Sequence, residues 1–318
     1  MTSALPEGWT WRRPGPDDAG AVYALVAESN TRVIGQADFT LEDAMDELSE
    51  PSFDLATDAW LVLDATGTAA GYAAVRAEEG ADHVEAELYA LDDTTTAWLH
   101  EAVADRADEI ARAAGQSTAT LDFAIYRQDD RRRAQVAALG HTIVTTFHRM
   151  RIDHDGPGSV PAPPPPPGVE LRTGPGDESF RRVAHDVKNA GFAEHFGWVD
   201  LPFERWHDQV EASPVRTWDQ LWLAEIDGVP AAMLHAHDGF LADEGCGYVS
   251  HLAVLSEFRG RGLAKLLLKT AFAADAANGR IGTLLHVDTN NPTPALDLYL
   301  GLGMRPVLVI DVWRRPGT

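Results

Sequence analysis

The chain has 318 residues, of which 45% are hydrophobic and 24% charged, a globular composition with enough length for two domains of ordinary size. Its formal net charge of −23 argues against nucleic acid as a partner, because binding by counterion release requires a basic surface. The single cysteine, Cys246, excludes an internal disulfide and a cysteine-rich metal site, and we expect it to be a small packing residue.

The sequence shows no sign of export or of membrane insertion. Residues 1–9 have neither the basic start nor the apolar core of a signal peptide. No apolar run approaches the about 20 residues that cross a bilayer as a helix. We therefore expect a cytoplasmic protein without a membrane partner.

Residues 1–152 are predicted to form a mixed α/β half: a short strand, two helices, a hairpin turning at residues 64–67, a central strand, a helix, a strand, a helix and closing strands. After the central strand, residues 90–98 contain two acids and no glycine, so a phosphate would be repelled there. The arginine run at residues 131–133 is interpreted as a solvated helix start and not as a phosphate site.

Residues 153–168 separate this half from the next. They include five consecutive prolines followed by glycine, a composition that forms neither a helix nor a central strand. The segment is therefore predicted to be a stiff, extended linker.

The segments on either side of the linker repeat each other. Pieces that match in order, at offsets of 160 to 163 residues, are 11–18 with 171–178, 61–75 with 222–236, and 139–141 with 302–304. This spacing indicates an internal duplication, so residues 169–318 are predicted to form a second mixed α/β half.

The second half contains a strand, a glycine-rich turn and a helix within residues 248–269. Gly260 and Gly262 permit backbone conformations that let several N–H groups point at one anion, and the following helix adds its unpaired N-terminal donors. Between Phe258 and Ala274 the chain has four basic residues and no acid. The turn is therefore a candidate phosphate site, although a solvated basic helix face would show the same charges.

Two motifs in this half resemble the GCN5-related N-acetyltransferases. Arg259-Gly260-Arg261-Gly262-Leu263-Ala264 fits the family's (Gln/Arg)-x-x-Gly-x-(Gly/Ala) signature, after a strand and before a helix. Residues 282–304 are similar to the family's next strand and to the helix that carries Leu-Tyr and closes on Leu-Gly-Met. The resemblance implies two tandem domains of this mixed α/β (α+β) fold, the first of them degenerate because residues 1–152 lack both motifs.

The resemblance also implies acetyl-CoA as co-substrate. No metal is expected, because the histidines show no spacing typical of metal ligands. The family's cofactor-binding positions fall on Leu252, Ala253 and Val254 for the pantetheine arm, on Arg259, Gly260, Arg261, Gly262, Leu263 and Ala264 for the pyrophosphate, and on Asn291. Tyr299 occupies the position of the family's general acid, which protonates the leaving thiolate. Simple core packing is the alternative role for Tyr299, because it lies in an apolar helical stripe.

The general base is left open by the sequence. The candidates are Glu194 and His195 in a segment rich in aromatic residues, His235 and His237 on the second hairpin, and His251 on the central strand. Deprotonation of the amine by water alone is the alternative. Trp198 in the same segment as Glu194 is a candidate wall of an acceptor pocket.

The tandem layout resembles the mycothiol synthase family, in which the acceptor is a cysteinyl amine. The readings that stay open are an N-acetyltransferase for the primary amine of an unidentified small molecule, a mycothiol-synthase-like enzyme for a cysteinyl amino-sugar, and a non-catalytic acetyl-CoA-binding regulatory module. The acidic chain favours a cationic acceptor. Two halves in one chain are consistent with a monomer, and a dimer is left open.

Overall fold

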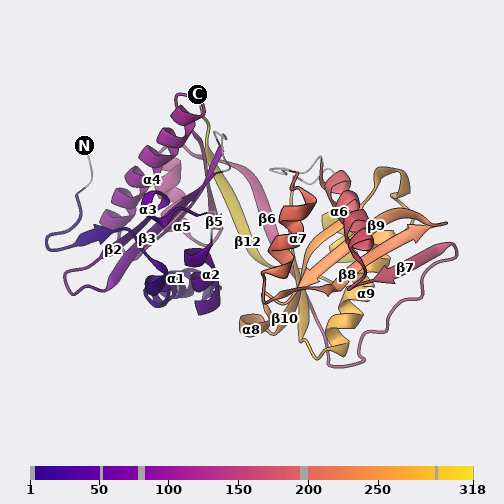
Figure 1. Ribbon diagram of the computed structural model, residues 1–318. Helices are drawn as coiled ribbons and strands as arrows, with labels where there is room; N and C mark the ends of the chain where they lie inside the picture. Colours follow the sequence, from indigo (N-terminus) through magenta and orange to yellow (C-terminus); the bar gives the residue numbers. More distant parts are fainter. Residues whose placement is uncertain (1–3, 51–52, 78–82, 194–199, 291–292, 318) are drawn as a thin grey trace. The chain divides into compact units, whose positions relative to one another are not determined.

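The computed structural model describes residues 4–50, 53–77, 83–193, 200–290 and 293–317. The chain forms two compact units, unit 1 with Met1–Thr146 and Val309–Thr318, and unit 2 with Phe147–Leu308. Each unit has a mixed sheet with helices on both faces, as Figure 1 shows for each. The predicted mixed α/β fold is confirmed.

Unit 1 is built on the strands β1 to β5 and the C-terminal part of β12. Its elements are β1 (Thr10–Arg12), α1 (Ala19–Ile34), α2 (Leu41–Ser49), α3 (Leu55–Asp58), β2 (Ala59–Leu63), β3 (Ala69–Arg76), β4 (His83–Ala90), α4 (Asp93–Ala113), β5 (Thr120–Tyr126), α5 (Asp130–Ala138), the start of β6 (Thr142–Asp153) and the end of β12 (Arg305–Arg315). The sheet order is β1-β2-β3-β4-β5-β12, and β4 and β5 run parallel.

Alternation along β3 assigns the two faces of this sheet. Ala73 and Val75 pack in one cluster with Leu99 and Val103 of α4. Tyr72 packs on the opposite face, in a cluster with residues of α1 and α2. Because successive side chains of a strand point to opposite faces, one strand contributes to both cores.

Unit 2 repeats this plan. Its elements are β6, β7 (Val169–Thr173), α6 (Glu178–Phe192), α7 (Phe203–Glu211), β8 (Arg216–Ile226), β9 (Val229–His237), α8 (Leu241–Glu244), β10 (Cys246–Val254), α9 (Leu263–Ala277), β11 (Gly282–Asp288), α10 (Ala295–Gly301) and the start of β12. The sheet order is β6-β11-β10-β9-β8-β7, and β10 and β11 run parallel.

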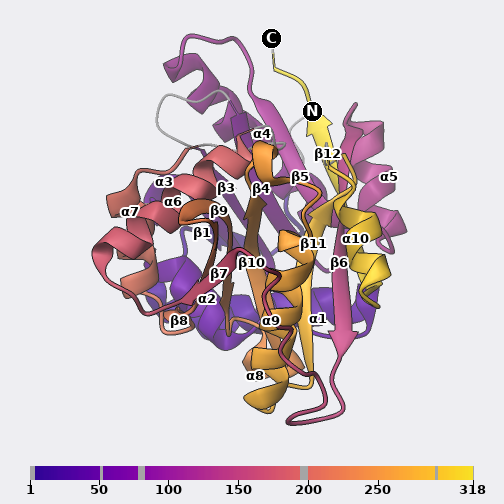
Figure 2. The same ribbon diagram turned by 90° about the vertical axis from the view of Figure 1, so that its right-hand side faces the viewer.

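Helix α9 covers one face of this sheet, and α6 and α7 cover the other. Figure 2 shows α9 in front of β10 and β11. Leu263, Leu267 and Phe272 of α9 are at most 2% exposed and pack with Leu234 of β9, as their helical spacing predicts. On the other face, Met233 packs with Trp206 and other residues of α6 and α7.

The compact units differ from the predicted halves at two strands. Phe147 to Asp153 of β6 pairs with β11, and Ile310 to Arg315 of β12 pairs with β5. The closing strand of each sequence half therefore completes the sheet of the other unit. Residues 154–168 contain no helix or strand, whereas Asp153, the first residue of the predicted linker, ends β6.

Candidate functional site

The two parallel strands of unit 2 part in the middle of the sheet. β10 and β11 pair from Cys246↔Gly282 to Val249↔Leu285. Beyond that point β10 continues along β9 and β11 continues along β6. A register shift between Val249 and His251 marks a bulge in β10, which bends a strand and turns a side chain to a new direction.

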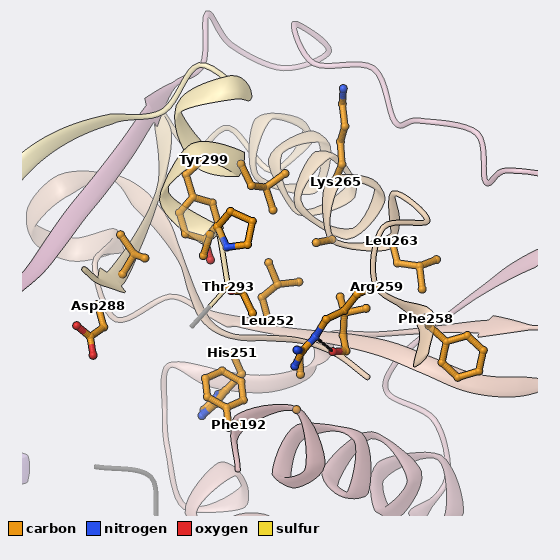
Figure 3. A pocket seen from close by; sticks show the side chains of 18 of the residues that line it. Phe192, His251, Leu252, Phe258, Arg259, Leu263, Lys265, Asp288, Thr293 and Tyr299 are labelled. Atoms are coloured by element: carbon orange, nitrogen blue, oxygen red, sulfur yellow. Dashed lines mark hydrogen bonds between the residues drawn. The ribbon is translucent and has the colours of Figure 1, made fainter. Parts of the chain in front are cut away.

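A cavity of about 680 Å³ lies at this parting. Its described walls come from β10 with the turn that follows it, the first turn of α9, the end of β11, α10 and the last residues of α6 (Figure 3). Leu252, Ala253 and Val254, the positions predicted for the pantetheine arm, line it.

The glycine-rich turn forms one end of the cavity. Gly260 and Gly262 line it and have positive φ angles of 77° and 81°, a conformation that residues with a side chain rarely adopt. Gly262 is the N-cap of α9 and carries no side chain to accept from the first N–H groups. These donors, and the positive end of the helix dipole, are therefore available to an anion.

Basic side chains surround this helix start. Lys265 and Arg259 line the cavity. The Nε of Arg259 lies 3.4 Å from the carbonyl oxygen of Val254, and the Arg261 guanidinium lies over the Phe258 ring at 5.3 Å. Within the described part of the chain, none of these three cations forms an ion pair with a carboxylate. Their charge is therefore not neutralised by the described protein side chains.

Tyr299 lines the cavity from α10. Figure 3 shows its ring reaching from the helix into the space between α9 and β10. The side chain is 8% exposed, and burial, assisted by Tyr248, raises the pKa of Tyr299 to about 12. A phenol with such a pKa keeps its proton at neutral pH and is a hydrogen-bond donor to a group in the cavity.

Of the candidate general bases that the structure describes, only His251 lines the cavity. His251 lines the cavity and lies edge-on to Phe192, with ring centres 5.7 Å apart. His235 and His237 are buried away from the cavity lining, and burial lowers the pKa of His235 to about 4 and the pKa of His237 to about 3. Glu194, His195, Trp198 and Asn291 lie outside the described residues.

Sequence reasoning assigned no site role to several polar or aromatic residues of the cavity wall, among them Ser250, His286, Asp288 and Phe147. Asp288 and Phe147 are partners in the ladder between β11 and β6, so β6 closes this side of the site. Asp288 could have been noticed from the sequence, because it ends a predicted strand inside the second motif. The motif, however, assigns no role to this position. The contribution of Phe147 depends on the strand exchange, which no local pattern reveals.

The corresponding place in unit 1 is filled by arginines. β4 and β5 also part, after Ala86↔Phe123, but Nη1 of Arg132 donates to the carbonyl oxygen of Leu88. Nη2 of Arg131 donates to the carbonyl oxygen of Ala90 at 3.2 Å. The arginine run begins the helix α5, as predicted, but it is not simply solvated, because burial of Arg132 lowers its pKa and both arginines donate to strand carbonyl oxygens.

The acidic segment after β4 caps a helix. The Asp92 side chain accepts from the N–H of Thr95 at 2.9 Å and so occupies the N-terminus of α4. A cavity of about 130 Å³ remains nearby, lined by residues including Glu87 and Arg132, and it is much smaller than the cavity in unit 2.

Three further observations concern Cys246, metal-binding side chains and membrane-spanning helices. Cys246 is fully buried and its pKa is raised to about 11 by burial, so it is a packing residue and not a nucleophile. Among the described residues no group of three or more His, Cys, Asp or Glu side chains could hold a metal ion. None of the described helices is long and apolar enough to span a membrane.

Comparisons with known proteins agree on the fold. Residues 185–304 match the model of the acetyltransferase (GNAT) family. The chain is similar to a GCN5-related N-acetyltransferase from Sphaerobacter thermophilus, with 23% identity, a TM-score of 0.81, and 98% of this chain and 96% of that chain covered. It is also similar to a tandem GNAT protein from the clavulanic acid biosynthesis pathway, with 17% identity, a TM-score of 0.72 and coverages of 96% and 98%.

A more distant structural likeness is to Saccharomyces cerevisiae N-myristoyltransferase, with 13% identity, a TM-score of 0.64 and coverages of 99% and 79%. The search of curated proteins gives no match.

Proposed function

We propose that this chain, whose residues 185–304 belong to the acetyltransferase (GNAT) family, moves an acetyl group from acetyl-CoA to a primary amine of a small molecule at a single site in unit 2. The observation that carries the proposal is the cavity at the parting of β10 and β11, where an uncapped helix start and Tyr299 face the same space. Acetyl-CoA supplies the thioester that the amine attacks.

The residues present fit this co-substrate. The N–H groups of residues 260–264, with Arg259 and Lys265 beside them, would hold the pyrophosphate. The backbone of Leu252 to Val254 would pair with the pantetheine arm, because β11 has left this stretch of β10. No described carboxylate among the cavity residues lies on the glycine-rich turn or on α9, so the proposed phosphate end is free of that repulsion.

Tyr299 would act as the general acid. When the amine nitrogen attacks the thioester carbon, the C–S bond breaks and the departing sulfur requires a proton. The tyrosine hydroxyl is protonated at neutral pH and lines the cavity, so it has a proton to give. Direct attack in a complex of both substrates needs no covalent enzyme intermediate, and the only cysteine is buried with a raised pKa.

The proposal assigns no acetyl-CoA site to unit 1. Arg131 and Arg132 donate to strand carbonyls at the place that corresponds to the pantetheine wall, and Asp92 caps the helix that would otherwise meet a phosphate. Unit 1 would therefore be a degenerate copy with a structural role.

Acetylation of a cysteinyl amino-sugar, and acetyl-CoA binding without transfer, are kept as outcomes of the test.

Calorimetric titration of the full chain with acetyl-CoA tests the proposal. We expect one site, and we expect Gly262→Asp to abolish it by placing a carboxylate at the start of α9. Gly279→Asp is a matched control, because Gly279 follows the other end of α9, has a similar φ of 76° and also has open space around it. Two sites would contradict the assignment of unit 1, and no binding would overturn the proposal.

Turnover is then measured with a panel of primary amines that includes cysteinyl-glucosamine. The release of CoA and the formation of acetylated amine are both followed, and their amounts should be equal. Binding of acetyl-CoA with no acetylated amine anywhere in the panel would favour the regulatory-module reading over an enzyme.

A further inference from the structure

Two histidines are among the described residues that line the cavity, His251 on β10 and His286 on β11. Either could in principle take the proton that an attacking amine must lose. Their hydrogen bonds distinguish them, because each ring has a neighbour whose donor or acceptor role is fixed by its chemistry.

His286 is held in a state that does not accept a further proton. Nε of Arg149 donates to Nε2 of His286 at 3.1 Å, and a guanidinium has no acceptor, so Nε2 carries the lone pair in this bond. The ring proton is then on Nδ1, 2.9 Å from the hydroxyl oxygen of Tyr248. Protonation of Nε2 would require the loss of the arginine bond.

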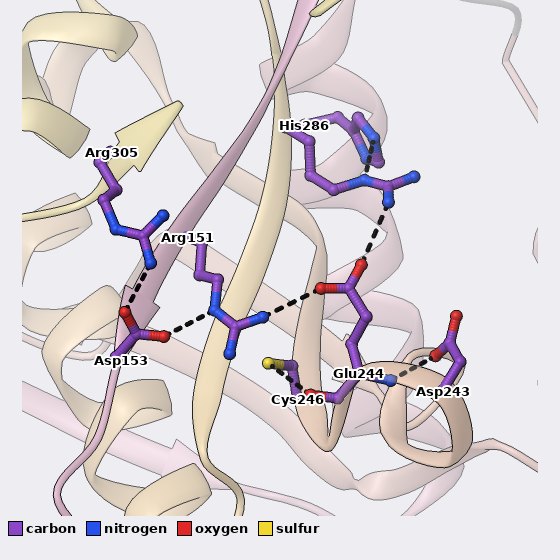
Figure 4. A network of polar contacts seen from close by, with 8 residues as sticks. Arg151, Asp153, Asp243, Glu244, Cys246, His286 and Arg305 are labelled. Carbon is purple, nitrogen blue, oxygen red and sulfur yellow. Dashed lines mark hydrogen bonds and ion pairs between the residues drawn. The ribbon is translucent and has the colours of Figure 1, made fainter. Parts of the chain in front are cut away.

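Arg149 is itself firmly held. It is 5% exposed, forms an ion pair with Glu244 at 3.2 Å and lies over the Phe240 ring at 4.8 Å. Glu244 also binds Arg151, and Figure 4 shows how this network runs from His286 to Asp153. His286 is therefore a fixed wall of the cavity and not its base.

His251 has the opposite arrangement. The hydroxyl of Ser250 donates to the backbone carbonyl oxygen of His235 at 3.0 Å, which uses its only proton because a carbonyl can only accept. Nδ1 of His251 lies 3.1 Å from the same hydroxyl oxygen and must therefore be the donor in that contact. A neutral ring that carries its proton on Nδ1 has its lone pair on Nε2.

The bulge in β10 makes this contact possible. In a regular strand the side chains of neighbouring residues point to opposite faces. The register shift falls between Val249 and His251, at Ser250, and the hydroxyl of Ser250 meets the ring of the next residue. The hydroxyl of Ser250 thus connects the His235 carbonyl of β9 to the ring of His251.

The surroundings keep His251 neutral. Burial is the main cause of a pKa well below the ordinary histidine range, and the positive charges of Lys188 on α6 and Arg216 on β8 add to it. His235 and His237 on β9 also face this ring and would add charge only when protonated. A neutral ring has a lone pair to offer at every pH near neutrality. The attacking nitrogen becomes more acidic as it bonds to the thioester carbon, and this favours transfer of its proton to the ring.

From this geometry we infer that His251 is the general base of the proposed acetyl transfer, acting through Nε2, and that Ser250 is a positioning residue that fixes its tautomer. The inference rests on the proposed function. The amine nitrogen forms a bond to the thioester carbon and the C–S bond breaks. The surplus proton on nitrogen goes to Nε2 of His251, and the thiolate takes the proton of Tyr299. The products are the acetamide and CoA thiol, and proton exchange with water restores both side chains.

The tautomer can be measured without knowing the acceptor. Nitrogen NMR of the full chain, labelled with ¹⁵N-histidine and saturated with CoA, distinguishes a protonated ring nitrogen from one with a lone pair. The His251 signals are identified by their loss in His251→Gln. We expect a protonated Nδ1 and an unprotonated Nε2 at neutral pH. A proton on Nε2 would overturn the inference.

Substitutions at Ser250 test its positioning role. Ser250→Ala removes the acceptor of the Nδ1 proton, so we expect the His251 ring to shift toward the tautomer with the proton on Nε2. Ser250→Thr keeps a hydroxyl and should restore the wild-type spectrum. An unchanged tautomer in Ser250→Ala would contradict the role of Ser250.

Turnover tests the base itself, with the best amine from the panel. His251→Gln should lower kcat by about 10²- to 10⁴-fold, the usual contribution of a general base, while acetyl-CoA binding stays intact. Ser250→Ala should lower kcat and Ser250→Thr should recover it. Full turnover in His251→Gln would overturn the base assignment. If acetyl-CoA does not bind to the wild-type chain, the proposed function fails, and the NMR result still decides the tautomer.

Discussion

The guanidinium of Arg132 donates to the carbonyl oxygen of Leu88, two residues beyond the last pair that β4 makes with β5. In unit 2 the equivalent stretch of β10, after its last pair with β11 at Val249, lines an open cavity of about 680 Å³. The two units therefore have the same parting of parallel strands, and an arginine of the chain itself occupies one of them.

Replacing this arginine should destabilise unit 1. Arg132→Met leaves a half-buried strand carbonyl without its donor, and we expect a loss of about 1–3 kcal/mol in the free energy of unfolding. Arg32→Met is the control, because Arg32 forms an exposed pair with Glu28 within one helix and should change stability by less than about 0.5 kcal/mol. Denaturant unfolding measures both, and equal effects would show that Arg132 has no special structural role.

The contact between α6 and β10 predicts a second effect. A Cβ on Gly191 would lie 2.7 Å from the Cβ of Ala253, so Gly191→Ala must push the helix end and the cavity strand apart. We expect a loss of about 1–3 kcal/mol from overpacking, together with weaker acetyl-CoA binding.

Gly20→Ala provides a comparison of opposite sign. Gly20 lies within α1 and has no atom within 4 Å of its Cβ position, so alanine there should stabilise the chain by roughly 0.5–1 kcal/mol. Thermal unfolding and calorimetry on both variants check the pair. Normal acetyl-CoA affinity in Gly191→Ala would show that the cavity wall tolerates the shift.

Local chemistry made part of this structure predictable. The hairpin turn at Asp227 and Gly228 could be predicted, because an Asp-Gly pair favours positive φ angles at both residues. The structure has φ angles of 51° and 78° there. The glycine-rich turn was readable for the same reason, and the buried face of α9 followed from the spacing of its leucines. Each of these features is decided by residues close together in the chain.

The remaining features depend on long-range pairing. Each of the closing strands β6 and β12 pairs with a strand far from it in the other half of the sequence, so nothing local states which sheet it completes. The places of His286 and Asp288 in the cavity wall follow from where β11 leaves β10, and this is a property of two strands and not of either sequence alone. The hydrogen bonds that distinguish His251 from His286 likewise join residues from separate strands.

Tyr299→Phe should separate chemistry from binding. Removal of one hydroxyl leaves the ring in the core, so acetyl-CoA affinity should remain, while kcat should fall by about 10²- to 10⁴-fold through the loss of a general acid. Because the pKa of Tyr299 is raised to about 12, the wild-type rate should show no loss from its ionisation until the pH is well above 10. Pre-steady-state release of CoA thiol measures the step, and an unchanged rate in Tyr299→Phe would reduce this residue to a packing role.

His235 should make stability depend on pH below neutrality. Burial lowers its folded-state pKa to about 4, against an ordinary value of 6.5, and its ring packs against both Trp206 and Trp218. Between pH 6.5 and 4 the unfolded chain binds the proton more readily, so lowering the pH across this window should reduce the free energy of unfolding by up to about 3 kcal/mol from this residue. His235→Phe keeps an aromatic ring and removes the titration. Denaturant titration from pH 4 to pH 7 measures the difference in unfolding free energy between the two proteins. This difference should change across the window and level off near neutrality. A constant difference would mean that His235 is protonated as easily in the folded chain as in the unfolded one.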